Sequence, residues 1–160
     1  MIRLDIINDK DKENLIEIFK NSEVKQTYML PDFDNEEGYV RLFENFKKMS
    51  NNPIRFLKGI YLDEQIIGFI NEVENNEESI ELGYVVSPKY KGNGYCTIAL
   101  EQSINYLFSK GYKEVICGAF EHNLASIRVM EKAGMTKISK VDQIEYRGKV
   151  HTCIYYSIVI

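Results

Sequence analysis

The stretch Tyr90–Leu100 reads YKGNGYCTIAL and places two glycines around one asparagine, directly before a helix-like run. Glycine permits backbone angles and close approaches that a Cβ would forbid. The N-terminus of a helix attracts negatively charged groups. The stretch therefore predicts either a cradle for a phosphate group or a simple bend, and the rest of the chain decides between them.

Length, composition and charge limit the classes of protein to which this chain can belong. It has 160 residues, of which 44% are hydrophobic and 28% charged, so we expect a single globular domain over residues 1–160. A formal net charge of -4 argues against binding to nucleic acid or to an anionic membrane. No segment approaches the ~20 apolar residues of a membrane span, and the N-terminal residues lack the apolar centre of a signal peptide. The expected location is cytoplasmic.

The cysteines and histidines argue against a disulfide framework and against a metal site. Cys96, Cys117 and Cys153 are widely spaced and odd in number, and no C-x-x-C pair occurs. The two histidines, His122 and His151, do not form a ligand cluster. We therefore expect Cys117 and Cys153 to be small buried thiols, and we expect no metal.

Hydrophobic periodicity predicts an α/β (α+β) chain whose sheet is mixed and mostly antiparallel, with helices against it, rather than a doubly wound parallel sheet. The middle of the chain is an antiparallel meander, and residues 113–120 are a continuous apolar run typical of a buried strand. The predicted helices cover residues 9–21, 35–49, 94–109 and 123–133, and the predicted strands cover 1–7, 54–62, 66–73, 79–87, 113–120, 135–142 and 150–159.

Two well-known phosphate motifs do not fit the glycine stretch. A Walker A loop needs Lys followed by Ser or Thr after its last glycine, whereas Tyr95 and Cys96 follow Gly94. A dinucleotide fingerprint needs a small residue where Thr97 stands, and it follows the first strand of a parallel unit rather than an antiparallel meander.

A third motif fits. Residues 91–96, KGNGYC, resemble the Gln/Arg-x-x-Gly-x-Gly/Ala loop of the GNAT superfamily of N-acetyltransferases. More narrowly, GNGYCTIAL is similar to the Gly-x-Gly-Tyr-Ala-Thr-x-Ala-Leu run of the RimJ/RimL-like branch. Lys91 stands where the motif has Gln or Arg, and Cys96 where it has Gly or Ala. Both departures keep a cation near phosphate and a small side chain near the cofactor.

Further segments carry the same resemblance. Residues 121–135, EHNLASIRVMEKAGM, are similar to the Asn-x-x-Ser-x-x-Val-x-Glu-Lys-x-Gly-Phe segment of this branch, with Met135 in place of Phe. Weaker matches are IELGYVVSPKY at 80–90 and HTCIYYSIVI at 151–160. Together they span roughly residues 80–157, while the N-terminal half resembles the family only in its order of elements.

The resemblance implies the GNAT fold, in which strands 79–87 and 113–120 run parallel and splay apart around acetyl-CoA, with no metal. Backbone N–H groups of residues 92–97 would bind the pyrophosphate. The pantetheine would pair with strand 79–87 as an added strand does. Asn123 would contact pantetheine unless it only caps a helix, and Lys132 a CoA phosphate unless it is merely solvated. The implied cofactor-binding residues are Val85, Val86, Lys91, Gly92, Asn93, Gly94, Tyr95, Cys96, Thr97, Asn123 and Lys132.

Acyl transfer to an amine requires a group that accepts the ammonium proton. Glu81 is the first candidate for this base, because it lies four residues before Val85 on the same strand face, about 13 Å away. The alternative is a carboxylate that is only solvated or paired. Glu145 resembles a base proposed in RimL-like members. Many family members use a tyrosine as general acid where this chain has Met130, and Ser126 is the substitute that the branch suggests, unless it only bonds a nearby carbonyl.

The sequence therefore predicts an acetyl-CoA-dependent N-acetyltransferase that acts by direct transfer in a ternary complex. The acceptor is a primary amine, either a protein N-terminus or a small molecule. The acids at 32, 34, 36 and 37 favour a cationic amine or simply cap a helix. A catalytically silent acyl-CoA sensor or interaction module is the alternative that Met130 leaves open. The sequence also leaves open both a monomer and a homodimer.

Overall fold

Seven strands form one mixed sheet in the order β1-β2-β3-β4-β5-β7-β6 in the computed structural model, which describes residues 1–160. The pairs β1/β2, β2/β3, β5/β7 and β6/β7 are antiparallel, and β4/β5 is parallel. The fold class predicted from the sequence is confirmed. The strands are β1 Ile2–Asp5, β2 Leu57–Leu62, β3 Gln65–Asn75, β4 Ser79–Val86, β5 Glu114–Phe120, β6 Thr136–Tyr146 and β7 Lys149–Val159.

The chain divides into two compact units. The first unit comprises residues 1–71 and 84–95, and the second unit comprises residues 72–83 and 96–160. No helix in either unit is long and apolar enough to cross a membrane. The helices are α1 Lys12–Lys20, α2 Ser22–Thr27, α3 Glu36–Ser50, α4 Tyr95–Ser109 and α5 Leu124–Lys132, with short 3-10 turns η1 Asp9–Asp11 and η2 Pro88–Tyr90.

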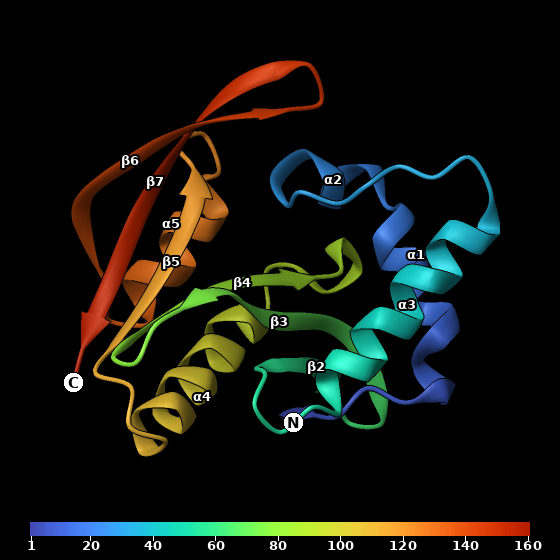
Figure 1. Ribbon diagram of the computed structural model, residues 1–160, viewed down its shortest axis with the longest axis horizontal. Coiled ribbons are helices and arrows are strands. Elements are labelled where there is room, and N and C mark those ends of the chain that lie inside the picture. The colour runs from blue at the N-terminus through green and yellow to red at the C-terminus, as the bar shows by residue number, and fades with distance from the viewer. The chain divides into compact units, whose positions relative to one another are not determined.

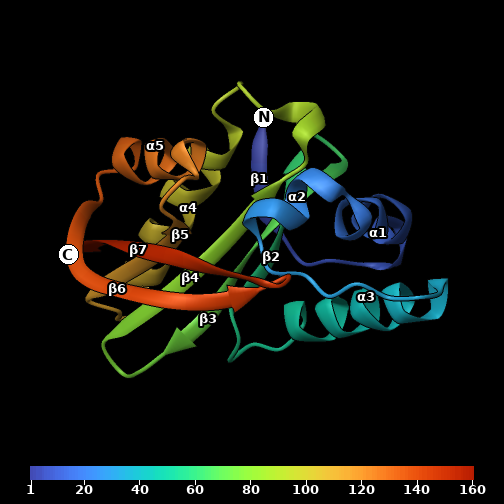
Figure 2. The ribbon, with the colours of Figure 1, turned by 90° about the horizontal axis from the view of Figure 1, so that it is seen from above.

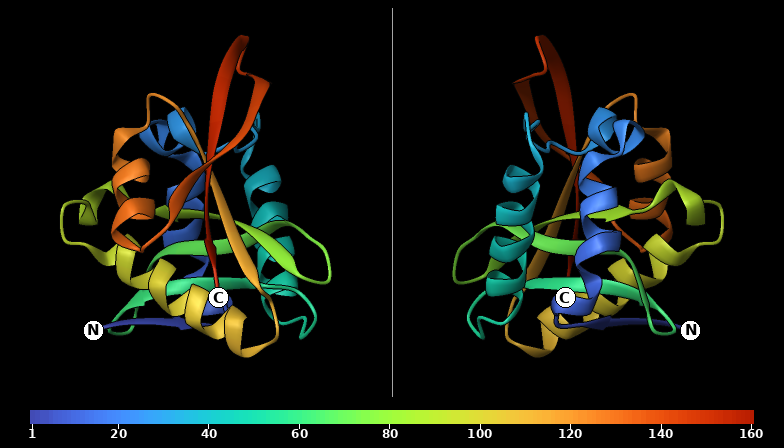
Figure 3. Two further views of the ribbon diagram at one scale, coloured as in Figure 1. Left: turned by 90° about the vertical axis from the view of Figure 1, so that its left-hand side faces the viewer. Right: turned by 90° about the vertical axis from the view of Figure 1, so that its right-hand side faces the viewer.

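In the first unit, α1 and α3 lie side by side (Figure 3) and pack their apolar faces on β2 and β3. Phe69 of β3 is fully buried at the centre of this core. Its ring makes edge-to-face contacts with Phe19, Tyr28 and Phe46, at centroid distances of 6.0, 5.3 and 4.9 Å. Such pairs stabilise a core beyond the area they bury.

Asparagine caps explain where the N-terminal helices begin. Asn35 accepts a hydrogen bond from the Gly38 N–H at the start of α3, and Asn21 accepts one from the Val24 N–H at the start of α2. An asparagine in this position satisfies an amide that the helix itself leaves unpaired. The sequence analysis missed α2, because a helix of six residues is too short to show a 3.6-residue period.

In the second unit, β7 lies between β5 and β6 (Figure 2). The parallel β4/β5 pair runs from Ser79↔Glu114 to Leu82↔Cys117. Both strands continue beyond their last pair, β4 to Val86 and β5 to Phe120. The pairing thus ends partway along both strands, as the expected parting of these strands requires. Figure 1 shows the β6–β7 hairpin continuing past the end of β5.

β6 contains a pronounced bulge. Lys137 pairs with Tyr156 and Val141 pairs with Ile154, so residues 138–140 stand opposite Tyr155 alone. A bulge bends its strand and redirects the side chains within it. The side chain of Lys140 is therefore aimed by the bulge and not by the regular alternation of the strand.

Replacing Phe69 with alanine tests the core of the first unit. We expect Phe69→Ala to lower the free energy of unfolding by about 3–5 kcal/mol, because it leaves a cavity among three aromatic rings. Urea unfolding followed by circular dichroism measures the change. Ile54→Ala, at a position where the residue is 84% exposed, serves as control and should alter stability by less than about 0.5 kcal/mol. Equal losses for both variants would contradict this description of the core.

Candidate active site

The glycine loop between β4 and α4 depends on two left-handed backbone conformations. Gly92 has φ +82° and Gly94 has φ +76°, and residues other than glycine rarely adopt such angles. A Cβ added at either position would meet no protein atom within 4 Å. Glycine is therefore needed for the shape of the backbone, while the space in front of both residues is open.

The backbone N–H groups of this loop are not used by the protein itself. The Asn93 side-chain amide donates to the carbonyls of Tyr90 and Lys91, at 3.0 and 3.3 Å, and so ties the loop to itself. The backbone N–H groups of Gly92, Asn93 and Gly94 have no hydrogen-bond partner. Helix α4 begins at the next residue, and the first amides of a helix are unpaired as well. Unpaired amides at a helix start form an anion-binding site.

Two lysines beside this loop form ion pairs within the first unit. The Lys91 ammonium lies 3.5 Å from a Glu23 carboxylate oxygen, with both side chains exposed. Lys89 of η2 pairs with Glu17 of α1 at 2.5 Å. Because exposed pairs are weak, Lys91 can exchange Glu23 for a phosphate at small cost.

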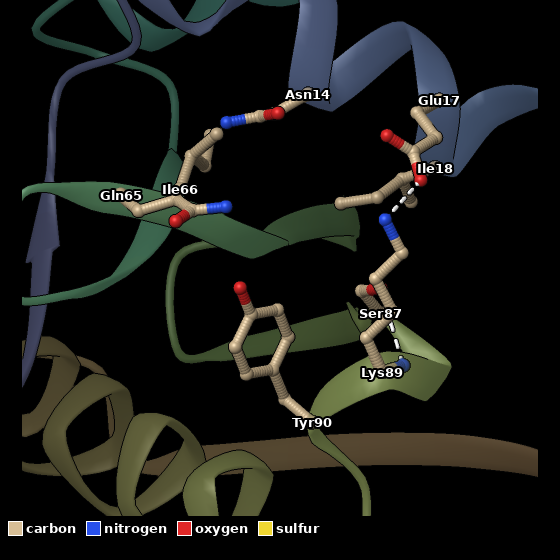
Figure 4. Close-up of a pocket in the computed structure, with 8 residues that line it drawn as sticks. All are labelled: Asn14, Glu17, Ile18, Gln65, Ile66, Ser87, Lys89 and Tyr90. Carbon is tan, nitrogen blue, oxygen red and sulfur yellow. Dashed lines mark hydrogen bonds and ion pairs between the residues drawn. The ribbon is translucent and has the colours of Figure 1, made fainter.

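A small pocket lies next to η2 in the first unit (Figure 4). The Lys89–Glu17 pair spans one side of it, and the Tyr90 ring lies on another. None of the cofactor-binding residues predicted from the sequence lines this pocket. Its lining residues are Asn14, Glu17, Ile18, Gln65, Ile66, Ser87, Lys89 and Tyr90.

The end of β4 distinguishes the two valines that were expected to pair with the cofactor. The Ser87 N–H donates to the Ile67 carbonyl at 2.7 Å. The Val85 carbonyl lies so close to Gly68 that a Cβ there would come within 2.0 Å of it. Both Ser87 and Val85 therefore present backbone groups to β3. Since these groups alternate along a strand, those of Val86 point to the opposite edge.

In the second unit, Glu81 is a largely desolvated carboxylate. It lies on β4 beside Ile116 of β5, and its side chain is 13% exposed. Burial raises the pKa of this carboxyl above its ordinary value, and the charges of Glu74 and Asp142 act in the same direction. The Lys140 ammonium, 3.9 Å from Glu81 Oε1, acts in the opposite direction. A carboxylate with a raised pKa is a stronger proton acceptor.

Lys140 and its neighbours are features that the sequence analysis missed. The Lys140 ammonium lies over the ring of Tyr155, 4.4 Å from its centroid. The Tyr155 hydroxyl donates to Asp142 at 2.7 Å. Since Lys140 and Asp142 meet Glu81 only through the pairing of distant strands, no local pattern could have revealed the cluster.

Helix α5 places the residues of the second motif. Asn123 caps the helix, and its side-chain oxygen accepts from the Ser126 N–H at 3.2 Å. The cap occupies the Asn123 oxygen but leaves its amide hydrogens available. Lys132 is exposed at the other end of the helix. Met130, at the position where many family members have tyrosine, is fully buried and therefore packs the core.

Glu145, the second candidate base, lies in the β6–β7 hairpin opposite Val150. Its side chain is exposed, and it lies five residues beyond Lys140 along β6. Of the two candidate bases, only Glu81 is desolvated, which favours Glu81 as the proton acceptor.

All three thiols are protonated at neutral pH. Burial raises the pKa of Cys96 to about 12 and also raises the pKa of Cys117 and Cys153. A thiol must lose its proton to act as a nucleophile. The structure therefore offers no thiolate that would carry an acetyl group as a covalent intermediate.

The acids of residues 32–37 are mostly paired within the first unit. Asp32 binds the buried Lys25 at 2.7 Å. Glu36 pairs with Lys20, and Glu37 lies 3.9 Å from Arg41. These pairs reduce the negative charge that the sequence suggested for a cationic acceptor.

Comparisons with known proteins agree with this fold. A family model described as "Acetyltransferase (GNAT) domain" matches residues 2–136. The Bacillus subtilis (strain 168) protein "Uncharacterized N-acetyltransferase YoaA" is 26% identical over 159 residues, which cover 96% of this chain and 90% of that protein. Among solved structures, microcin C7 self immunity acetyltransferase MccE in complex with acetyl-CoA and AMP is 21% identical, with a TM-score of 0.84 over 99% of this chain and 92% of that one. RimL, a ribosomal L7/L12 alpha-N-protein acetyltransferase in complex with coenzyme A, is 15% identical, with a TM-score of 0.87. The match covers 99% of this chain and 94% of RimL.

The glycine loop, the mixed sheet and the sequence match define an acyltransferase enzyme. The chain belongs to the GNAT acetyltransferase family.

The desolvation of Glu81 predicts how its replacement changes stability with pH. Because the folded-state pKa is raised above its unfolded value of 4.5, the contribution of Glu81 to stability is fully present below that value and is lost as pH rises through the folded pKa. Glutamine does not titrate, so the stability of the wild type relative to Glu81→Gln should fall as pH rises above about 4.5. Urea unfolding at several pH values measures this difference. A rise with pH in the stability of the wild type relative to Glu81→Gln would contradict the assignment.

Proposed function

We propose that this chain transfers the acetyl group of acetyl-CoA to a primary amine by direct attack within a ternary complex, as a RimJ/RimL-like member of its family. The observation that carries the proposal is the loop of residues 92–94, whose three unpaired N–H groups precede a helix start. Such a group of donors suits a diphosphate. The resemblance to MccE, whose crystal contains acetyl-CoA, supports the same cofactor here.

In this proposal, the glycine loop and the end of β4 bind different parts of the cofactor. The amides of residues 92–97 bind the pyrophosphate, while Lys91 moves from Glu23 to a phosphate oxygen. Asn93 acts through the loop shape, since its side chain is bonded to that loop. Val86 pairs with the pantetheine through its outward backbone groups, whereas Val85 holds β4 against β3. In the second unit, the amide hydrogens of Asn123 supply a further contact, and Lys132 an outlying phosphate contact.

Glu81 is the proposed general base. The acceptor arrives as an ammonium, and Glu81 removes its proton directly or through a water molecule. The amine nitrogen then forms a bond to the thioester carbon, the carbon–sulfur bond breaks as the nitrogen gives up its second proton, and CoA leaves as a thiolate that takes up a proton. Ser126 is the proposed donor of that proton, and the second proton of the nitrogen restores its hydroxyl. Since a thiolate is a moderately good leaving group, the buried Met130 at the tyrosine position does not prevent turnover.

The acceptor is a protein N-terminus or a small primary amine, used in the cytoplasm. Asp32 binds the buried Lys25, whereas the pairs of Glu36 and Glu37 are exposed and weak, so these acids do not distinguish a polyamine from an acceptor with one amine. Labelled acetyl-CoA with cell extract, against the same assay with pooled small amines, separates the two acceptor classes.

Replacing Glu81 tests the chemical step. Glu81→Gln keeps the shape of the side chain but cannot accept a proton, so kcat should fall about 100- to 10,000-fold while the affinity for acetyl-CoA stays unchanged. Release of free thiol from acetyl-CoA over a panel of amines and peptides measures the rate. Glu145→Gln is the matched control and should retain activity. Binding of acetyl-CoA with no turnover on any amine would instead identify a silent sensor.

Replacing Gly94 tests the loop. Gly94→Glu forces a side chain into a left-handed conformation and sets a negative charge before the phosphate site, so binding of CoA should be lost in isothermal titration calorimetry. Gly148→Glu, in the β6–β7 turn, is the control, because Gly148 has the same φ of +76° and the same open space. It should bind CoA normally. Unchanged affinity of Gly94→Glu would show that the phosphate site lies elsewhere.

A further inference from the structure

We propose that Lys140 is a positioning residue for Glu81, and that its ammonium keeps the Glu81 carboxylate ionised. This inference rests on the proposed function, because it assigns a task to the base used there. It concerns residues of the second unit alone.

The bulge in β6 is the device that brings Lys140 to Glu81. Residues 138–140 stand opposite the single residue Tyr155, so the regular alternation of β6 is broken just before Val141. The Lys140 ammonium consequently reaches 3.9 Å from Glu81 Oε1. Lys137, on the same strand before the bulge, is exposed and forms no ion pair with Glu81.

Tyr155 holds the lysine in this place. The Lys140 ammonium lies 4.4 Å from the centre of the Tyr155 ring, a distance at which a cation is attracted to an aromatic face. The Tyr155 hydroxyl is in turn fixed by its 2.7 Å hydrogen bond to Asp142. The Tyr155 ring, fixed by its hydrogen bond to Asp142, thus helps to hold the Lys140 ammonium in place. The position of Lys140 does not depend on its weak ion pair with Glu81 alone.

The charges around Glu81 show why a cation is needed. Asp142 of β6 and Glu74 of β3 both oppose ionisation of Glu81 through their negative charge. The neighbouring Cys117, Cys153 and Tyr155 are neutral groups with raised pKa values. Lys140 is the one positive group that acts on Glu81. A buried carboxylate without a cation takes up a proton, and a protonated Glu81 cannot receive the proton of an amine.

The pH dependence of catalysis tests the proposal. Lys140→Met should raise the pKa of Glu81 and move the acidic limb of kcat/KM to higher pH, which gives a loss of about three- to tenfold near pH 6 and little loss near pH 9. Lys140→Arg keeps the charge and should keep the wild-type profile. Lys137→Met removes the same charge from the same strand and should change nothing. A loss of equal size at every pH would mean that Lys140 only packs on Tyr155, and would overturn the proposal.

A second measurement separates this proposal from the proposed function. Carbon-13 NMR of labelled glutamate carboxyl groups, with Glu81→Gln to assign the signal, follows the ionisation of Glu81 in the resting protein. The Glu81 titration should move to higher pH in Lys140→Met and stay in place in Lys137→Met. An unmoved titration overturns the role of Lys140, whatever the enzyme acetylates. A moved titration, together with full activity of Glu81→Gln, upholds the pairing and rejects Glu81 as the base.

Discussion

The proposed function depends on three backbone N–H groups, those of Gly92, Asn93 and Gly94, which have no hydrogen-bond partner in the protein. All three residues are exposed, so their amides can be hydrated and need no protein partner. The left-handed conformations of the two glycines make the arrangement possible, and the Asn93 side chain secures it from within. The proposed anion site is thus built from backbone groups, and it uses the Asn93 side chain to hold its shape.

The chemistry of the second unit follows from a balance between burial and charge. Burial makes Glu81 a better proton acceptor but also favours its neutral form. The adjacent ammonium of Lys140 shifts that balance toward the ionised form without removing the effect of burial. General bases need both properties, since a carboxylate with an ordinary pKa is weak and a protonated one is inactive. The nearby thiols of Cys117 and Cys153 are protonated, which is consistent with the proposal that Glu81 is the general base.

Sequence periodicity located most of the elements, and the reason for each miss is physical. The strand and helix patterns located β1 to β7 and α1, α3, α4 and α5, but β6 ends at Tyr146, four residues beyond the predicted end of strand 135–142. Helix α2 escaped because its six residues depend on the Asn21 cap more than on an apolar face. The acids at 32–37 suggested an open negative patch, but most are neutralised by lysines and an arginine that fold beside them. Pairing between side chains is not visible in composition.

The sequence by itself determined the glycine loop before α4, because two glycines around an asparagine before a helix are a local pattern with a local conformation. It also determined the family, through motifs whose spacing reflects one strand and one helix. Only the tertiary structure decided which carboxylate is desolvated, which valine faces the free edge of β4, and that a lysine stands beside Glu81. These features arise from the register of the strands, which brings together residues far apart in the chain, and from the bulge in β6. The periodicity of a single segment predicts neither the register nor the bulge.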